Sequence, residues 1–531
     1  MVDWGGHPQF PNLPIYQFPN LPTRSEDVKD WNVEKAAYAA IGLLAAALRL
    51  FQLGLRPLSE GEAAQALAAF RFSQGAASAA PAGTIPALFA GNVLGFSLMG
   101  ANDLTARWLP ALAGLILVLL PYGLRRQLGR GGALAASLLL ALSPTAIYFS
   151  RNLDGAILVA ACGLALIVGL VNYLDTWRPA FLYLSAVALG LGLTAGSGIY
   201  AWLLIVAAFG LLLYVGSRFL HRDWGWSALA GGWLAARAEA GLPVRLGATL
   251  AATFGLVATV LALYPGGMGH AADLLAAWLT GFAPGHNPQP YIYPWLLLLR
   301  YEPLILALGL IEMGRWLVSR TIHRPKTVGQ VSNLPNIEQD TSWTPFWVFW
   351  AAVALLLLPL SGQRAAGNTL LAVTPLALLA GQGVARAWRW ISRRALWAEA
   401  GLMAGAALVL GGFFYLQLAA YSQAVGSIPL ELLGTDLPTA TSYLLLAGAA
   451  VLLLFGLGVI AWMWRSPDLI VAGGWLALVV ALGAFGFKAA WSLNVAHAAD
   501  ARELMAGGWA TAPDVRALVD HLEALSLEKS G

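Results

Sequence analysis

The stretch DGAILVAACGLALIVGLVNYL, residues Asp154–Leu174, carries no charged side chain after its first residue. About 20 apolar residues in a helix suffice to cross the roughly 30 Å hydrocarbon core of a bilayer. The stretch therefore predicts a membrane-spanning helix that begins next to an acidic residue. Segments of the same kind recur along most of the chain.

The amino-acid composition excludes a water-soluble protein. Of the 531 residues, 59% are hydrophobic and 11% are charged, whereas about 25% are charged in a typical soluble domain. The mean hydropathy is +0.68, and disorder would require low hydrophobicity with high charge. The single cysteine, Cys162, excludes an intrachain disulfide framework and a cysteine-based metal cluster. The basic residues are dispersed and the net charge is only +4, so the pI near 9.1 does not indicate nucleic-acid binding.

Thirteen segments are apolar enough to predict membrane-spanning helices, so the expected fold class is an all-α polytopic membrane protein. Their ranges are 33–52, 104–123, 131–149, 154–174, 180–195, 197–216, 247–264, 292–317, 345–361, 368–385, 397–418, 441–464 and 469–489. Residues 180–216 also fit a single long interrupted segment.

The loops on one side of these predicted spans are rich in arginine and lysine. With a cytoplasmic N-terminus, 20 of the 31 basic residues fall on the inner side. Because basic loops stay in the cytoplasm, we expect a multi-pass protein of the cytoplasmic (plasma) membrane with its N-terminus inside and its C-terminus outside. Residues 1–32 lack a charged region followed by an apolar core, so no cleavable signal peptide is expected.

The sequence divides into three parts. Residues 1–32 form a cytoplasmic segment rich in Pro and Asn, where FPNLP occurs at Phe10–Pro14 and again at Phe18–Pro22. This repeat fits a flexible insertion or a motif that docks a partner. Residues 33–490 form the transmembrane domain, and residues 491–531 form an outer tail with a short amphipathic helix.

The first outer loop, residues 53–103, contains two helical patterns that are not expected to span the membrane. Glu60–Phe72 has charged residues interspersed among alanines and leucines, and Ile85–Met99 is apolar but short. Both stretches are expected to form interfacial helices. Asp103 and Arg107, one helical turn apart, are expected to have a structural role.

Four segments within the first 160 residues resemble the start of a GT-C membrane glycosyltransferase. They are Arg49-Leu50, LGLRPLSEGEAAQAL (Leu53–Leu67), GANDLTARWLPAL (Gly100–Leu112) and SPTAIYFSRNLDGAIL (Ser143–Leu158). Within that superfamily the chain is most similar to the protein O-mannosyltransferase and aminoarabinose-transferase-like group. A later segment, NPQPYIYPWLLLLRYEPLIL (Asn287–Leu306), resembles a bacterial and archaeal branch of the group.

The resemblance implies an enzyme of the cell envelope that moves a hexose or pentose from a polyprenyl-phosphate carrier to an acceptor on the extracytoplasmic face. In such relatives an Asp-Glu pair opens the first outer loop, and a second acidic residue starts a later span. Glu62 matches the Glu of the pair, Gly61 stands where the Asp is expected, and Asp154 matches the second acid. The neighbouring Glu60 could substitute for the missing Asp, or the site could be inactive.

Transfer of a sugar to a hydroxyl requires a carboxylate within about 2.6–3.2 Å of the group that loses its proton. It also requires cations that stabilise the departing lipid phosphate. The candidate catalytic carboxylates are Glu62, Glu60 and Asp154. The candidate phosphate ligands are Arg151, Arg300 and Arg364, because a guanidinium fits phosphate oxygens.

Each of these candidates also fits a simpler structural role. Glu60 and Glu62 could solvate an interfacial helix. Arg151 and Asp154 could form a surface ion pair, and Arg364 could be a solvated loop residue.

Two ionisable residues, Arg300 and Glu302, lie inside the apolar run YPWLLLLRYEPLILALGLIEM. A charge inside a membrane segment is costly and is therefore a functional hypothesis. Pro303 predicts a broken or re-entrant helix that places Arg300 beside the lipid phosphate. Alternatively, the two residues neutralise other buried groups or reach outward. Tyr293, with its aromatic neighbours, fits an interfacial belt better than a surface on which a sugar stacks.

No cofactor is expected, because His270 and His286 have no partner at metal-ligand spacing. Binding of a divalent metal is the alternative to this expectation. The expected partners are a polyprenyl-phosphate sugar donor, membrane lipid and, in an assembly, other membrane proteins, but not nucleic acid. Gly61 also motivates a non-catalytic structural subunit of a membrane complex. A lipid or solute transporter is a third hypothesis, although no internal repeat supports it. The sugar and the acceptor are not encoded in any recognisable motif.

Overall fold

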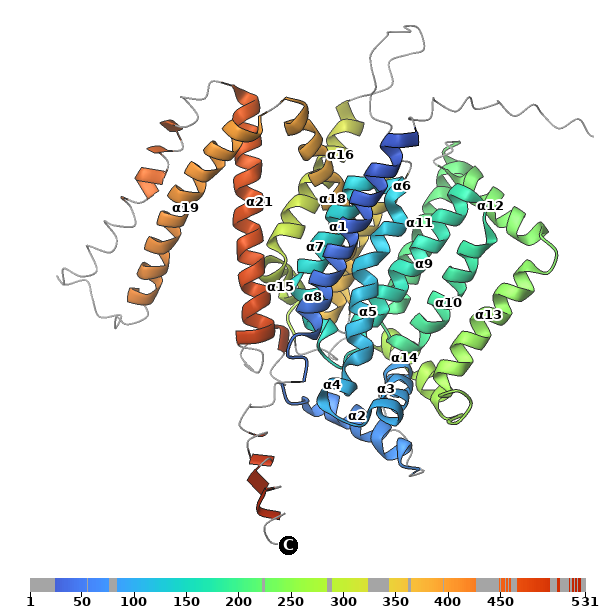
Figure 1. Ribbon diagram of the computed structural model, residues 1–531. Coiled ribbons are helices and arrows are strands. Elements are labelled where there is room, and N and C mark those ends of the chain that lie inside the picture. Colours follow the sequence, from blue (N-terminus) through green and yellow to red (C-terminus); the bar gives the residue numbers. More distant parts are fainter. Residues whose placement is uncertain are drawn as a thin grey trace, which may run out of the picture.

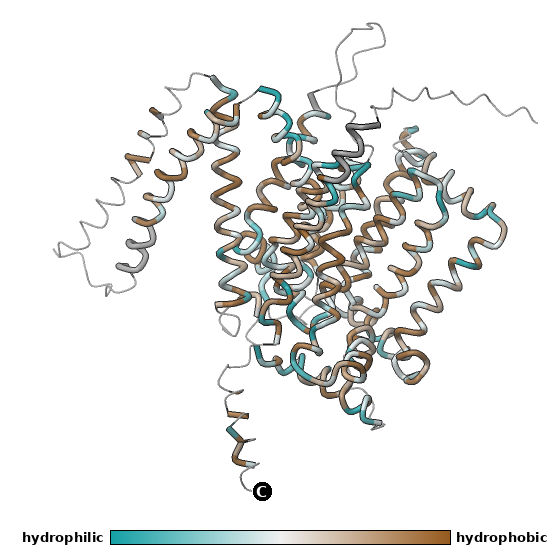
Figure 2. Tube along the Cα trace, in the orientation of Figure 1, coloured by the Kyte–Doolittle hydropathy of each residue, from teal (hydrophilic) through white to brown (hydrophobic). Residues whose placement is uncertain are grey.

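The computed structural model describes residues 24–54, 56–75, 84–221, 225–283, 289–322, 343–361, 364–394, 396–425, 466–496 and 504–506, with scattered positions between 448 and 459 and between 515 and 526. Every regular element in these residues is a helix, which confirms the predicted all-α class. Figure 1 shows helices packed side by side, with several short helices gathered at the lower end of the bundle. Figure 2 shows that hydrophobic residues follow the helices along most of their length.

Ten α-helices among the described residues have 17 or more residues. They are α1 (Arg24–Leu50), α9 (Ala156–Thr176), α10 (Pro179–Ala195), α11 (Ile199–Phe219), α13 (Leu242–Ala258), α16 (Pro303–Ile322), α17 (Thr344–Leu360), α18 (Leu370–Arg393), α19 (Trp397–Val425) and α21 (Pro467–Trp491). The shorter α-helices are α2 (Glu60–Ser73), α3 (Pro86–Met99), α4 (Asp103–Ala106), α5 (Trp108–Leu119), α6 (Arg125–Leu128), α7 (Arg130–Leu142), α8 (Pro144–Ser150), α12 (Trp226–Ala238), α14 (Gly267–Thr280) and α15 (Tyr293–Tyr301). Single turns of other helix types are η1 (Leu120–Leu124), η2 (Ala366–Thr369), η3 (Ser492–Ala496) and η4 (Leu504–Ala506).

The described residues contain six helical segments that are long and apolar enough to span a membrane, or eight if each of two bent helix pairs counts as one span. The predicted multi-pass membrane protein is therefore confirmed, but the count of thirteen spans is not. Two predicted spans, α10 and α17, have only 17 residues each. The segment 180–216 forms two helices, and most of the predicted span 441–464 lies outside the described residues.

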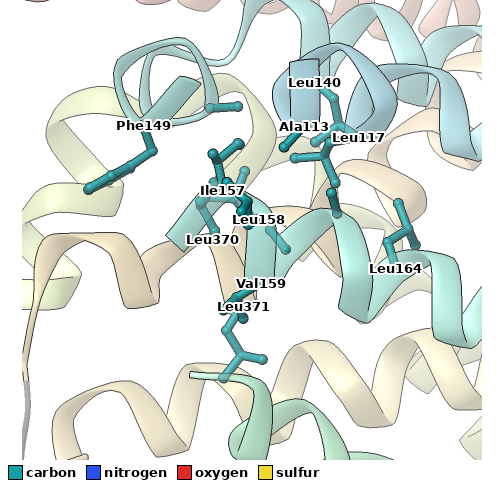
Figure 3. Packing of buried hydrophobic residues seen from close by; sticks show 14 of the residues in the cluster. Ala113, Leu117, Leu140, Phe149, Ile157, Leu158, Val159, Leu164, Leu370 and Leu371 are labelled. Atoms are coloured by element: carbon teal, nitrogen blue, oxygen red, sulfur yellow. The ribbon is translucent and has the colours of Figure 1, made fainter. Parts of the chain in front are cut away.

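Helix α9 lies in the centre of the bundle and packs against α5, α10 and α18. Figure 3 shows Leu158 and Val159 of α9 close to Leu370 and Leu371 of α18. Burial of these apolar side chains contributes about 25 cal/mol per Å². The beginning of α9, and with it the loop that carries Asp154, is therefore fixed by the core.

The two short helices predicted within residues 53–103 are present as α2 and α3, and their interfacial position stays a prediction. They lie with α4 and α14 at the same end of the bundle (Figure 1). Pro86 begins α3, where proline costs no hydrogen bond because the first N–H groups of a helix have no partner. Helices α12 and α14 have no counterpart among the predicted segments.

The predicted span 131–149 is broken at Ser143, which the sequence analysis does not anticipate. Helices α7 and α8 are bent by 60° at this point. The last carbonyl groups of α7 need partners, because a membrane interior offers no water. Arg49 of α1 is fully buried and donates to the carbonyl oxygens of Leu140 at 3.2 Å and Ala141 at 3.3 Å.

The predicted break at Pro303 is present, because α15 ends at Tyr301 and α16 begins at Pro303. Glu302 lies between the two helices and is buried. Its carboxylate accepts hydrogen bonds from Ser143 Oγ at 2.5 Å and from the backbone N–H of Thr145 at 2.9 Å. Glu302 therefore links the break between α7 and α8 to the break between α15 and α16.

Candidate functional site

Glu62 is buried in the first turn of α2. Its Oε2 accepts the backbone N–H of Ser59 at 2.9 Å, as in a capping box. Arg107, which is fully buried, donates to Oε1 at 3.1 Å and to Oε2 at 2.9 Å. Oε1 also accepts the N–H of Leu153 at 2.7 Å. This carboxylate therefore connects α2 to the loop that carries Asp154.

Arg107 fixes the beginning of the segment between α1 and α2. Its guanidinium donates to the carbonyl oxygens of Leu53, Arg56 and Pro57 at 3.3, 2.8 and 3.2 Å. Burial raises the pKa of Glu62, but the positive charges of Arg107 and Arg56 outweigh burial and lower that pKa to about 2. A carboxylate with such a low pKa and so many donors is a poor proton acceptor. The geometry therefore favours a positioning role for Glu62.

Asp154 lies where two cavities meet. It belongs to the loop between α8 and α9, and its Oδ1 accepts the N–H of Ala156 at 2.7 Å. Asp154, Ala365 and Gly367 line both cavities. Asp154 is exposed at this junction, yet the surrounding protein restricts hydration of its carboxylate. This desolvation raises the pKa of Asp154, and the negative charge of Glu62 adds to the rise.

The large cavity has a volume of about 680 Å³ and lies between α9, α11, α14 and η2. Its walls are mostly apolar and include the aromatic side chains of Trp202 and Trp278. The titratable side chains on its described walls are Asp154, Asp273 and His270, and these walls include no lysine or arginine. The cavity therefore suits an uncharged or partly apolar ligand better than a phosphate.

The small cavity has a volume of about 260 Å³ and is more polar. Its polar lining side chains are Arg56, Ser59, Glu62, Gln65, Tyr148, Asn152 and Asp154. Arg56 is the basic residue among the described lining residues. Its Nη2 lies 3.4 Å from Glu62, and its guanidinium lies 5.8 Å from the centroid of the Tyr148 ring. Arg56 is not among the predicted site residues, and its spacing from Glu62 in the sequence gives no signal that would have identified it.

Arg151, a predicted phosphate ligand, lines neither cavity. Its guanidinium donates to the carbonyl oxygens of Leu48, Phe51 and Gln52 at 3.2, 2.6 and 3.2 Å. The last carbonyl groups of a helix have no partner within the helix. Arg151 therefore completes the end of α1, and its placement supports a structural role.

The other two predicted phosphate ligands also line neither cavity. Arg300 is exposed in the last turn of α15, with its guanidinium 5.5 Å from the centroid of the Tyr301 ring. The Arg364 guanidinium lies 3.8 Å from the centroid of the Tyr291 ring. It also donates to the carbonyl oxygen of Gln289. Arg364 thus connects two loops at the surface.

Two further predicted binding residues have partners within the protein. Glu302 binds the start of α8, as described above. Tyr293 is buried, and its hydroxyl donates to the carbonyl oxygen of Leu504 at 2.6 Å. The next residue, Met505, is buried and lines the small cavity. Tyr293 therefore holds a C-terminal segment of the chain against the small cavity.

Glu60 is exposed in the first turn of α2 and lines neither cavity. Within the described ranges, no group of three or more His, Cys, Asp or Glu side chains is placed to hold a metal ion. His270 lines the large cavity with its Nδ1 3.8 Å from Asp273, whereas His286 lies outside the described residues. Of the predicted site residues, the structure thus brings together Glu62 and Asp154.

A known protein family matches part of the chain that contributes to this site. Residues 86–237 match a family model described as dolichyl-phosphate-mannose-protein mannosyltransferase. The matched range includes Asp154 but not Glu62. The match confirms the predicted resemblance to GT-C membrane glycosyltransferases and supports glycosyl transfer as the class of enzyme. No curated protein matches the chain.

Several solved structures have a similar arrangement of helices. ArnT from Cupriavidus metallidurans bound to undecaprenyl phosphate is 16% identical, with a TM-score of 0.48 over 89% of this chain and 79% of that chain. Its apo structure is 16% identical, with a TM-score of 0.45 over 88% and 77% of the two chains. The oligosaccharyltransferase from Archaeoglobus fulgidus in the apo form is 13% identical, with a TM-score of 0.45 over 84% and 56%. At this level of similarity, function has to be inferred from the residues of the site and from the matched family.

Proposed function

We propose that the protein is a membrane glycosyltransferase that moves a sugar from a polyprenyl-phosphate carrier to an acceptor hydroxyl, with Asp154 as the general base. The observation that carries this proposal is the position of Asp154 at the junction of the two cavities. The family model matched by residues 86–237 supports it, because its description names mannose on dolichyl phosphate, a long isoprenoid carrier.

The charges of the two cavities suggest where each substrate binds. The carrier phosphate fits the small cavity, where Arg56 offers a guanidinium fork. The large cavity repels a phosphate, because Asp154 and Asp273 line it and no described lysine or arginine does. We therefore assign the acceptor and most of the sugar to the large cavity, where aromatic walls can pack against a sugar ring.

In the proposed reaction the acceptor hydroxyl attacks the anomeric carbon of the sugar while Asp154 takes the hydroxyl proton. The bond between the anomeric carbon and the phosphate oxygen breaks, and its electron pair leaves with the carrier phosphate. Arg56 stabilises the charge that develops on this phosphate. Glu62 positions the base through the N–H of Leu153 and holds Arg56 by an ion pair at 3.4 Å.

A second candidate function is a non-catalytic subunit of a membrane complex, and Gly61 is the observation that favours it. The family resemblance places an aspartate at this position. Gly61 lines the small cavity, and a Cβ there would contact nothing within 4 Å. A carboxylate would therefore fit sterically where this chain has glycine.

A transfer assay distinguishes the two candidates. Membranes that contain the overproduced protein are incubated with radiolabelled polyprenyl-phosphate hexoses and pentoses, and both released carrier phosphate and labelled acceptor are measured. The enzyme should transfer at least one of these sugars. Absence of transfer from every donor, together with consistent copurification of other membrane proteins, would favour the non-catalytic subunit.

Arg56→Gln should raise the KM for the carrier donor by about 10-fold to 100-fold, because a hydrogen bond to a charged group contributes about 1.5–3 kcal/mol. Arg56→Lys keeps the charge but loses the fork, so it should recover only part of the affinity. Steady-state rates of carrier release give KM for each variant. Arg364→Gln, outside both cavities, serves as the control, and an unchanged KM in Arg56→Gln would contradict the proposed phosphate contact.

We place the N-terminus in the cytoplasm and both cavities on the outer side of the membrane. Leu370 at the start of α18 lines the large cavity, whereas Arg386 and Arg389 lie near the other end of this helix. In a Cys162→Ala background, a membrane-impermeant thiol reagent added to whole cells should label Asp273→Cys but not Arg389→Cys. Labelling of the second variant alone would reverse the topology.

A further inference from the structure

A third cavity lies at the other end of the bundle from Asp154. It has a volume of about 790 Å³, and none of its lining residues belongs to the large or the small cavity. Its walls come from α9, α10, α11, α12, α13 and the beginning of α17, and most of its side chains are apolar. We propose that this α12 cavity binds one membrane phospholipid, with an acyl chain between the helices and the lipid phosphate at Arg237.

The rim of the α12 cavity is continuous with the lipid-facing surface. The helices that line it carry exposed large apolar side chains, namely Leu211, Leu212, Trp233, Leu234 and Val244. Binding cavities of ordinary ligands have volumes of about 300–1,000 Å³, so the α12 cavity has room for a lipid chain. Apolar cavities are not favourable for water. In a bilayer, the acyl chains of lipids are the apolar groups available to fill such a cavity.

The charged residues on the described walls of the α12 cavity are Arg237 and Asp175. Asp175 accepts hydrogen bonds from Gln127 Nε2 at 2.6 Å and from Trp343 Nε1 at 2.9 Å. These neutral donors stabilise the carboxylate at the end of α9. A phosphate would therefore bind at Arg237 and away from Asp175.

Arg237 lies in the last turn of α12 and is exposed. Its guanidinium lies 5.2 Å from the centroid of the Trp233 ring. The nearby carboxylate of Glu239 lies 3.8 Å from Arg245. A guanidinium beside an exposed tryptophan at the edge of an apolar cavity is the chemistry that recognises a lipid headgroup.

We infer that the occupant of the α12 cavity is not the polyprenyl-phosphate carrier of the proposed transfer reaction. Asp154 precedes α9, whereas Tyr173 and Asp175 near the end of α9 line the α12 cavity. A 21-residue helix is about 30 Å long. A carrier phosphate at Arg237 could not reach Asp154, so the site fits a resident phospholipid of the bilayer.

Gly210 allows a direct test, because it lines the α12 cavity and a Cβ there would contact nothing within 4 Å. Gly210→Phe should fill the cavity without a clash at Cβ. Gly247→Phe is the matched control, since Gly247 is equally unobstructed, is exposed on α13 and does not line the cavity. Each purified protein is extracted, and its bound lipids are identified and counted by mass spectrometry.

Wild type and Gly247→Phe should retain one phospholipid per chain, and Gly210→Phe should retain about tenfold less, which corresponds to 1.4 kcal/mol. Arg237→Gln should also retain less. Added phospholipid should raise the Tm of delipidated wild type but not of Gly210→Phe, because a ligand of the native state stabilises it. Equal phospholipid in all variants, bound polyprenyl phosphate, or detergent alone in the cavity would overturn the proposal. No sugar-transfer assay enters this test, so its outcome is independent of the proposed function.

Discussion

Asp154→Asn should lower kcat for sugar transfer by at least about 100-fold if Asp154 is the proposed general base, since this is the lower end of what such a base contributes. The amide has nearly the shape of the carboxylate but cannot take a proton from the acceptor. The variant should still fold, because the amide oxygen can accept the N–H of Ala156 as Oδ1 does. Release of carrier phosphate from the identified donor, measured at saturating substrate, gives the rate.

The pH dependence of the same reaction should identify the base. Because desolvation raises the pKa of Asp154, activity should fall as the pH drops through a value above the ordinary range of an aspartate. The pKa of Glu62 is about 2, so Glu62 stays ionised over this range. Asp154→Asn should lose this acid limb together with most of its activity.

Glu60→Gln is the control, because Glu60 is exposed on α2 outside both cavities. It should keep the rate and the pH profile of the wild type. Full activity in Asp154→Asn, or loss of activity in Glu60→Gln alone, would contradict Asp154 as the base and would indicate that the base lies in the segment between α1 and α4.

Glu62→Gln is expected to destabilise the protein by about 3–5 kcal/mol, because removal of one partner of a buried ion pair leaves the other charge uncompensated. The side chains of Arg107 and Glu62 are 0% and 6% exposed, and their closest atoms are 2.9 Å apart. Thermal unfolding in detergent, followed by loss of the native elution volume, measures the change. Because the pKa of Glu62 is lowered in the folded protein, its ionised carboxylate should stabilise the fold fully above pH 4.5. This contribution to stability should be lost as the pH falls toward about 2.

A double-mutant cycle separates a positioning role from a catalytic one. Arg107→Met alone should be about as destabilising as Glu62→Gln, and the variant that combines Glu62→Gln with Arg107→Met should be less destabilised than the sum of the two single effects. If Glu62→Gln keeps the Tm of the wild type but loses transfer, then Glu62 is itself the base that the family resemblance implies. If both properties change together, Glu62 acts through the structure of the loop.

Much of the helical architecture could be predicted from apolar runs alone. The break at Pro303 follows from the chemistry of proline, and the pattern after Ser59 correctly predicts a short helix. The break at Ser143 has a similar signal in Pro144, which begins α8, but the predicted span 131–149 ran through it. The partner of the end of α7 could not be predicted, because Arg49 comes from a distant part of the sequence.

The candidate site was less predictable than the fold. Glu62 and Asp154 converge as the resemblance implies, since both line the small cavity. The predicted phosphate ligands Arg151, Arg300 and Arg364 line neither cavity, and a guanidinium can donate to backbone carbonyl groups as well as to a phosphate. Arg151 binds carbonyl groups about one hundred residues away along the chain. Only the three-dimensional structure shows that Arg56 lines the small cavity.

The bridge made by Glu302 has a consequence for movement. Helix α8 leads into the loop that carries Asp154, and its first residues are tied to the junction of α15 and α16. A displacement of the Asp154 loop would therefore be transmitted to α16, more than one hundred residues later in the chain. During a reaction cycle these two parts of the molecule would shift as one unit, and a substrate that strains one of them would strain both.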